Sequence, residues 1–393
     1  MSDVAGLLSE LIAIPTHHGT RQGPRAEEGD ELALCRHVAP LLAARGADEV
    51  EVVETGRATG GPGGYAFARW GTPRLLVNAH VDTVPANSGW SRDPWTPAIE
   101  GGRLYGLGAC DTKGAIAAAL CAAERARPRD VAMLFSGDEE SGTASVHHFL
   151  GSPRRAGIER AIVCEPTARR AGVAHRGVLA ARATVRGVGG HSSRADHLPA
   201  PIVTMARLAT LLDHLGKRFR ELGPDDLRGL CMNVAALEGG VAFNVIPTSA
   251  SLLWSIRPWP GFDRASWDQL TAGAIAALDA DVRLEVTLDH APFAGGGPAL
   301  RALVGGHARA FGSLDFWTEA ALYAEAGIDA IVIGPGDIAQ AHAADEYVTL
   351  DDLAWAVDLF ASVFAAHGGD GARGGDGANG ARAGDGANGA RGG

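Results

Sequence analysis

The sequence predicts an α/β protein whose mostly parallel central sheet is flanked by helices and which carries an inserted α+β domain. Three observations indicate this fold class. Short apolar runs end in polar or charged residues, helix-like stretches lie between these runs, and a long middle segment shows a different, alternating pattern. A repeated order of strand and helix is typical of α/β sheets, whose buried parallel strands appear as nearly continuous apolar runs.

Apolar runs supply the expected strands of the central sheet. They are RLLVNAHVD (74–82), VAMLFSGDEE (131–140), AIVCEPT (161–167) and AIVIGPGD (330–337). Helix-like stretches occur at Lys113–Arg125 and Ser145–Leu150. Because ligands of such sheets gather beyond the carboxyl ends of the strands, the polar residues that end these runs mark the expected site.

The middle of the chain favours a second domain. LAARATVRG (179–187) and ASLLWSIRP (250–258) alternate like half-exposed strands, whereas 201–215 has helical periodicity. We therefore expect a discontinuous main domain of residues 1–175 and 287–367 around an inserted domain of residues 176–286. The segment 368–393 contains GDGANGAR twice and has no large apolar residue, so we expect a disordered tail.

Composition excludes several classes of protein. With 393 residues and 46% hydrophobic content, the chain can build its own cores, and its net charge of −11 argues against a nucleic-acid partner. Asp3 and Glu10 stand where a signal peptide would be basic, and no apolar run approaches the roughly 20 residues that span a bilayer. The odd, scattered cysteines are expected to be thiols in a reducing compartment, which indicates a cytoplasmic protein without a membrane partner. They are Cys35, Cys110, Cys121, Cys164 and Cys231.

Imidazole and carboxylate side chains recur where the apolar runs end. The candidates are His80, Asp82, Asp111, Glu139, Glu140, Glu165 and His342. Singly, each acid is compatible with an exposed loop charge, and His80 with Asp82 is compatible with a merely structural pair. Their recurrence at the same end of four strands indicates a metal site.

The charges of these candidates favour a pair of divalent cations. Three carboxylates (Asp111, Glu140 and Glu165) and two neutral imidazoles (His80 and His342) would leave two such cations with one uncompensated positive charge, which a bridging hydroxide would neutralise. Nitrogen and oxygen ligands without a thiolate motif favour zinc, with cobalt or manganese as substitutes. Cys110 and Cys164 flank ligand candidates, but we expect both to be small buried residues.

The adjacent acids Glu139 and Glu140 are suited to two different tasks. Consecutive residues that leave a strand point in different directions, so one carboxylate can bind metal while the other acts as a general base. His80 and Asp82 lie two residues apart, and a carboxylate in that position can fix the tautomer of a histidine ligand.

In this order, the motifs resemble those of the di-zinc metallopeptidases that include acetylornithine deacetylase, succinyl-diaminopimelate desuccinylase, aminoacylases and glutamate-releasing carboxypeptidases. The resemblance spans roughly residues 5–365. Its motifs are NAHVDTVP, GLGACDTKG, FSGDEESG, VCEPT, GVGGHSSRAD, NVIP, SIRP and IGPGDIAQAH. The stretch from DFWTEA to DEYVTL is most similar to the deacetylases of acetylornithine and acetylcitrulline.

This resemblance implies a role for each matching residue. One zinc ion would be bound by His80 and Glu165, the other by Glu140 and His342, with Asp111 bridging both, Asp82 orienting His80 and Glu139 as the base. The inserted domain would be a dimerisation lid, and His191 would reach the partner's active site to steady the oxyanion. Asn244, Arg257, Thr318 and Glu319 resemble substrate-binding positions, and the fork of Arg257 suits an α-carboxylate.

The implied activity is removal of the N-acetyl group from N-acetylornithine or N-acetylcitrulline, a step of arginine biosynthesis, by a homodimer. Alternatives are an aminoacylase or dipeptidase of the same family, succinyl-diaminopimelate desuccinylase, a hydrolase of N-carbamoyl groups, and a dimeric binding protein without catalysis. The last alternative requires a missing ligand or base, and none is missing.

Overall fold

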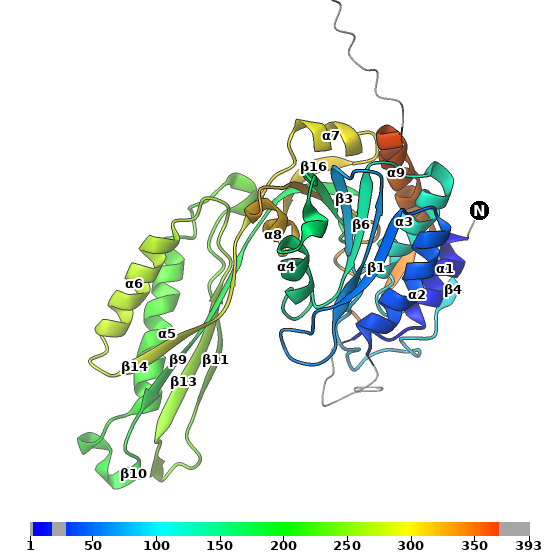
Figure 1. Cartoon of the computed structure of the whole chain (residues 1–393). Helices are drawn as coiled ribbons and strands as arrows, with labels where there is room; N and C mark the ends of the chain where they lie inside the picture. Colours follow the sequence, from blue (N-terminus) through cyan, green and yellow to red (C-terminus); the bar gives the residue numbers. More distant parts are fainter. Residues whose placement is uncertain (1–2, 18–28, 369–393) are drawn as a thin grey trace, which may run out of the picture.

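A central sheet organises the larger part of the molecule, as seen in the computed structural model, which describes residues 3–17 and 29–368 (Figure 1). Its strands follow the order β1-β2-β6-β3-β7-β17-β8-β15, with β16 beside β8. The neighbours β6, β3, β7 and β17 run parallel, and the pairs β1-β2, β2-β6 and β8-β15 are antiparallel. The bounds are β1 Glu49–Glu54, β2 Gly64–Trp70, β3 Leu75–His80, β6 Val131–Ser136, β7 Arg160–Val163, β8 Arg170–His175, β15 Phe293–Ala294, β16 Ala310–Leu314 and β17 Asp329–Val332.

Helices cover both faces of this sheet, which explains why its inner strands are apolar throughout. Every residue of β3 is buried, and its side chains alternate between two cores, with Leu76 in one and Val77 in the other. Helices α1, α2, α3, α7 and α9 contribute to the core that contains Val77, and α4 and α8 contribute to the other. The bounds are α1 Val4–Ile12, α2 Glu31–Ala44, α3 Lys113–Ala126, α4 Ala144–Leu150, α7 Pro298–Val304, α8 Ala320–Glu325 and α9 Leu350–Gly368. The predicted α/β architecture is confirmed.

A second sheet forms an elongated unit that extends away from the first (Figure 1). Its order is β11-β13-β9-β14, all antiparallel, and helices α5 and α6 pack on one face. The bounds are β9 Val178–Arg186, α5 Pro201–Arg218, β11 Asn233–Gly239, β13 Ser249–Ile256, α6 Arg264–Ala276 and β14 Val282–His290. The chain passes between the two sheets at 175–178 and again at 290–293.

Short pairings complete the described part of the chain. Strand β10 (Gly190–His191) pairs with β12 (Val245–Ile246) at the far end of the elongated unit. Strand β5 (Arg103–Tyr105) pairs with both β4 (Ala98–Glu100) and β18 (Tyr347–Thr349). The expected tail at 368–393 lies, apart from the last residue of α9, outside the described residues.

The cysteines agree with the expectation that they are thiols. All five cysteines are free thiols, and only Cys231 is exposed. Within residues 3–17 and 29–368, no helix combines the length and the apolarity that crossing a bilayer requires. The small-residue run in α3 is instead buried between the central sheet and helices α1 and α9.

The core of the elongated unit depends on Trp267, which is fully buried on α6. Its ring packs edge-on against Trp254 at 6.0 Å and Phe219 at 5.8 Å between ring centroids. Replacing Trp267 with Ala should lower the free energy of unfolding by about 3–5 kcal/mol, because it leaves a cavity that neighbours cannot fill. Urea denaturation followed by far-UV circular dichroism measures the change.

The matched control is Val203→Ala on α5, a position that is 50% exposed. Its effect should stay within about 0.5 kcal/mol. A similar small loss for both variants would contradict the role of Trp267 in this core.

Candidate metal centre

The candidate ligands gather at the carboxyl ends of the four parallel strands. His80 is the last residue of β3, Glu140 follows β6, Glu165 follows β7, and His342 lies beyond β17. Asp111 lies just before α3. Because parallel strands end at one edge of a sheet, His342 becomes a neighbour of Glu140 and Asp111, which lie 202 and 231 positions earlier.

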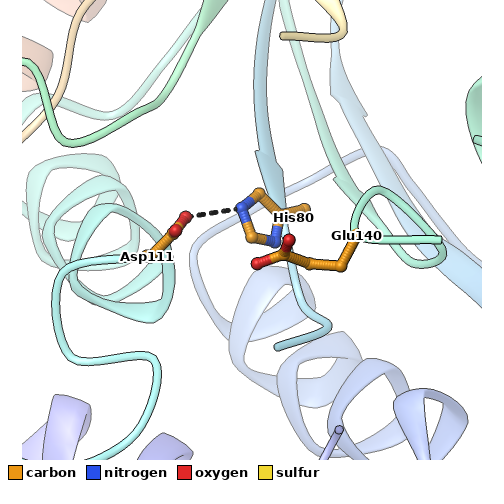
Figure 2. Close-up of side chains that lie close together, drawn as sticks. All are labelled: His80, Asp111 and Glu140. Atoms are coloured by element: carbon orange, nitrogen blue, oxygen red, sulfur yellow. Dashed lines mark hydrogen bonds and ion pairs between the residues drawn. The ribbon is translucent and has the colours of Figure 1, made fainter. Parts of the chain in front are cut away.

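Three of these side chains offer ligand atoms that all lie within 4.8 Å of one another (Figure 2). They are His80, Asp111 and Glu140. His80 Nε2 is 2.8 Å from Asp111 Oδ1, and His342 Nε2 is 2.8 Å from Glu140 Oε1 and 3.4 Å from Asp111 Oδ2. The two oxygens of Asp111 therefore face two different imidazoles, which is the arrangement that a bridging carboxylate requires.

The hydrogen bonds of this cluster change the charge state of its histidines. Contacts with Asp111 and Glu140 raise the pKa of His342 to about 10. Burial lowers the pKa of His80, but hydrogen bonds to Asp111 and Asp82 outweigh burial and hold it well above its usual value. Burial also opposes ionisation of Asp111, yet the two histidines keep the pKa of its carboxyl below the usual range. The imidazoles thus supply positive charge that Asp111 needs.

Glu139 and Glu165 are acids next to this cluster, and no ion pair joins either of them to a Lys, Arg or His side chain within residues 3–17 and 29–368. Burial, together with the charges of neighbouring carboxylates, raises the pKa of both well above the usual value. Each is within electrostatic range of the other and of His80 and Glu140. Crowded, buried carboxylates of this kind are costly unless cations accompany them.

The donor set therefore fits divalent metal ions. It combines carboxylate oxygens and imidazole nitrogens, which zinc binds readily. The neighbouring thiols do not compete, since burial raises the pKa of Cys110 and Cys164 and keeps them protonated. Both are buried, as expected.

Asp82 is positioned differently from what strand alternation predicts, because β3 ends at His80 and Asp82 lies in the following loop. His80 Nδ1 is 2.9 Å from the main-chain oxygen of Asp82 and 3.6 Å from its carboxylate. The carboxylate also accepts hydrogen bonds from the backbone N–H groups of Glu139 (3.2 Å) and Glu140 (3.0 Å). Asp82 thus positions both the histidine and the pair of acids.

Thr318 and Glu319 are buried, with exposures of 0% and 1%, and Glu319 is within electrostatic range of Glu139 and Glu165. The Thr318 hydroxyl is 3.0 Å from His175 Nε2, and Glu319 accepts a hydrogen bond of 2.8 Å from Ser136. Burial raises the pKa of Glu319 to about 7. Their direct contact with a substrate stays a prediction.

His191 and Asn244 lie far from the cluster within one chain. Both are exposed near the β10–β12 pair at the outer tip of the elongated unit (Figure 1). Arg257 is also exposed, but it directly follows β13 at the opposite end of that strand. An eight-residue strand spans about 25 Å, so one chain does not bring Asn244 and Arg257 together.

Sequence reasoning missed Glu346. This carboxylate is 2% exposed and accepts hydrogen bonds from backbone N–H groups of the loop that carries Asp111. No periodicity reveals it, because AADE (343–346) between His342 and β18 has the composition of an exposed turn.

Comparisons with known proteins agree with this geometry. The profile of peptidase family M20/M25/M40 matches residues 76–366. An N-acetyl-L-citrulline deacetylase from Xanthomonas campestris is 36% identical over 377 residues, which is 90% of this chain and 96% of that protein. An acetylornithine deacetylase from Myxococcus xanthus is 33% identical over 300 residues, covering 72% of this chain and 77% of that protein.

Solved structures share the fold. A metallo-carboxypeptidase of the M20 family from Sulfolobus solfataricus has a TM-score of 0.75 at 17% identity, covering 93% of this chain and 99% of that chain. A dinuclear metal-binding peptidase of the M20 family from Bacillus subtilis has a TM-score of 0.65 at 15% identity, covering 92% and 97%. The extent of the sequence matches shows that this chain belongs to peptidase family M20/M25/M40 and is a metal-dependent hydrolase.

Proposed function

We propose that the protein removes the acetyl group from an N-α-acetyl amino acid, N-acetylcitrulline or N-acetylornithine, as a step of arginine biosynthesis in the cytoplasm. The observation that carries the proposal is the position of Asp111 between two imidazoles, beside the acids Glu139 and Glu140. The names of the relatives support the acetyl amino acid as substrate.

Two zinc ions are the proposed cofactors, and cobalt or manganese would serve in their place. His80 and Glu165 would hold one cation, Glu140 and His342 the other, and Asp111 would bridge them. The 2.8 Å and 3.4 Å contacts around Asp111 support this division. Bound cations would polarise the amide carbonyl and make a water molecule more acidic.

Glu139 is proposed as the general base. Its carboxylate accepts a proton from the attacking water and later delivers that proton to the departing nitrogen of the amino acid. The backbone N–H of Glu139 is held by Asp82 at 3.2 Å, which fixes where the side chain begins. A raised pKa suits a group that must both accept and return a proton.

Substrate recognition would come from both units. Arg257 is proposed to hold the α-carboxylate through its planar fork of N–H donors, with Asn244 as a second polar contact. Thr318 and Glu319 would border the acetyl amino acid after closure around it. Both side chains are held by hydrogen bonds, Thr318 to His175 and Glu319 to Ser136. They would therefore form a rigid wall of the substrate pocket.

A homodimer would resolve the distance of His191 and Asn244 from the metal ligands. Large apolar side chains are exposed around both residues, and Phe243 is 99% exposed. The others on this tip are Val188 (69%), Val241 (89%) and Val245 (41%). Exposed apolar patches of this kind mark interfaces. The partner subunit's His191 would then donate a hydrogen bond to the oxyanion that forms at the acyl carbon.

The alternative functions either act on a different substrate or involve no catalysed reaction. An aminoacylase, a dipeptidase or succinyl-diaminopimelate desuccinylase would use the same metal ligands with another acyl pocket. A non-catalytic dimeric binding protein is disfavoured because all five metal ligands and the base are present.

A substrate panel tests the proposed reaction. The zinc-loaded enzyme should release acetate from N-acetylcitrulline or N-acetylornithine with a kcat/KM at least about tenfold above that for dipeptides and N-succinyl-diaminopimelate, since one pocket contact of 1.4 kcal/mol has that effect. Free amino groups are quantified over time. Preference for a dipeptide would replace the proposal with the peptidase alternative.

Glu139→Gln isolates the role of the base. The variant should keep two bound metal ions and lose about 100- to 10,000-fold in kcat, because the amide cannot accept the proton. Metal content by mass spectrometry is the control for an intact site. Near-normal turnover with both metals present would remove Glu139 from the mechanism.

Mixed dimers test whether His191 acts across subunits. His191→Ala and Glu139→Gln should each be nearly inactive alone. After the two variants are mixed and allowed to exchange subunits, activity should recover to about a quarter of the wild-type value, because half of the dimers carry one complete site. An unchanged mixture that demonstrably contains mixed dimers would show that His191 does not work in trans.

A further inference from the structure

Glu346 is tied to the loop before Asp111 through both its backbone and its side chain. Its main-chain oxygen accepts a hydrogen bond from the N–H of Gly106 at 3.0 Å. Its carboxylate accepts three more, from Gly108 N at 3.0 Å, Cys110 N at 2.9 Å and Asp111 N at 3.2 Å. One buried residue thus satisfies four backbone donors of a six-residue segment.

The loop depends on these hydrogen bonds because its residues belong to no helix or strand that could supply acceptors for the same N–H groups. Residues 106–111 form turns between β5 and α3, and Gly108 has a φ of +81°, a conformation that favours glycine. A buried N–H group without an acceptor destabilises the folded state. The Glu346 carboxylate accepts three such groups and therefore stabilises this conformation of the loop. The third of these N–H groups belongs to Asp111 itself.

Glu346 also belongs to the segment that carries His342. The two are four positions apart, and the segment continues directly into β18, which pairs with β5. This pairing fixes the segment that carries His342 and Glu346 to β5, the strand that precedes the Asp111 loop. Glu346 lies where the His342 segment and the Asp111 loop are joined.

Two proposed metal ligands lie on the segments that Glu346 joins. His342 Nε2 lies 3.4 Å from Asp111 Oδ2, although 231 positions separate the residues in the sequence. The side chain of His342 is 51% exposed, so surrounding packing does little to hold it. The backbone of the segment that carries His342 must therefore hold this residue in position.

We propose that Glu346 is a positioning residue that holds the bridging Asp111 and His342 at the spacing required by the second metal ion. The inference rests on the proposed di-metal function. Glu346 does not touch the substrate or the reacting atoms. Its effect is on the affinity of the site that uses Glu140 and His342, more than on the site that uses His80 and Glu165.

Glu346→Gln is the sharpest test. The amide keeps one oxygen for Cys110 and Asp111 but turns an NH₂ group toward the N–H of Gly108, so donor faces donor. The metal-free protein is titrated with zinc against a chromophoric chelator, and cobalt-loaded protein is followed by its visible absorption spectrum. We expect one ion bound as in the wild type and about 10- to 100-fold weaker binding of the second, with an altered cobalt spectrum.

Asp345→Asn is the matched control. Asp345 is the neighbouring acid, and its carboxylate bonds Ser91 N at 3.0 Å and Ser91 Oγ at 2.7 Å, away from the Asp111 loop. The same change from acid to amide at this position should leave both zinc affinities and the cobalt spectrum near wild type. An equal loss in both variants would mean that the segment needs acids in general, which overturns a specific role for Glu346.

Two further outcomes separate the inference from the proposed function. If the wild type binds two ions and Glu346→Gln binds both with unchanged affinity and spectrum, only the inference is overturned. If the wild type binds no pair of ions, the di-metal function fails and the inference fails with it. Should Glu346→Gln not fold, Glu346→Asp decides, because its shorter carboxylate keeps the charge but cannot reach all three N–H groups; unchanged binding there overturns the inference.

Discussion

The site depends on buried negative charge that the protein itself only partly neutralises. The imidazoles of His80 and His342 stabilise Asp111 as a carboxylate, whereas Glu165, which is buried, and Glu139, which is half-buried, are crowded acids. Such an arrangement is unfavourable in a purely structural cluster. It is the arrangement expected where divalent cations complete the charge balance.

Around these acids, the main chain is held by further carboxylates. Asp82 accepts the N–H groups of Glu139 and Glu140, and Glu346 accepts those of the Asp111 loop. Both acids therefore act through the backbone of loops that carry proposed metal ligands. A hydrogen bond to the backbone fixes the position of the Cα atom from which a side chain extends. A hydrogen bond to the side chain alone fixes only the direction of that side chain.

The elongated unit raises a different problem, since its polar residues are distributed along its length. Arg257 lies beside the passage between the two sheets, while His191 and Asn244 lie at the outer tip among exposed apolar side chains. A single chain cannot use all three at one site without a large rearrangement. Association through the tip would bring His191 and Asn244 to a neighbouring site and would bury the apolar side chains at the same time.

The sequence by itself determined the parallel strands, the helices between them and the residues at the strand ends, because apolar periodicity and residue type are local properties. It therefore predicted His80, Asp111, Glu140, Glu165 and His342 as a group. Only the tertiary structure decided that Asp111 faces two imidazoles, that the Asp82 carboxylate also accepts the backbone N–H groups of Glu139 and Glu140, and that Thr318 and Glu319 are buried. The same holds for Glu346, which has the local pattern of a surface turn. These features depend on which distant segments pack together, and that packing is a property of the whole chain that no local pattern records.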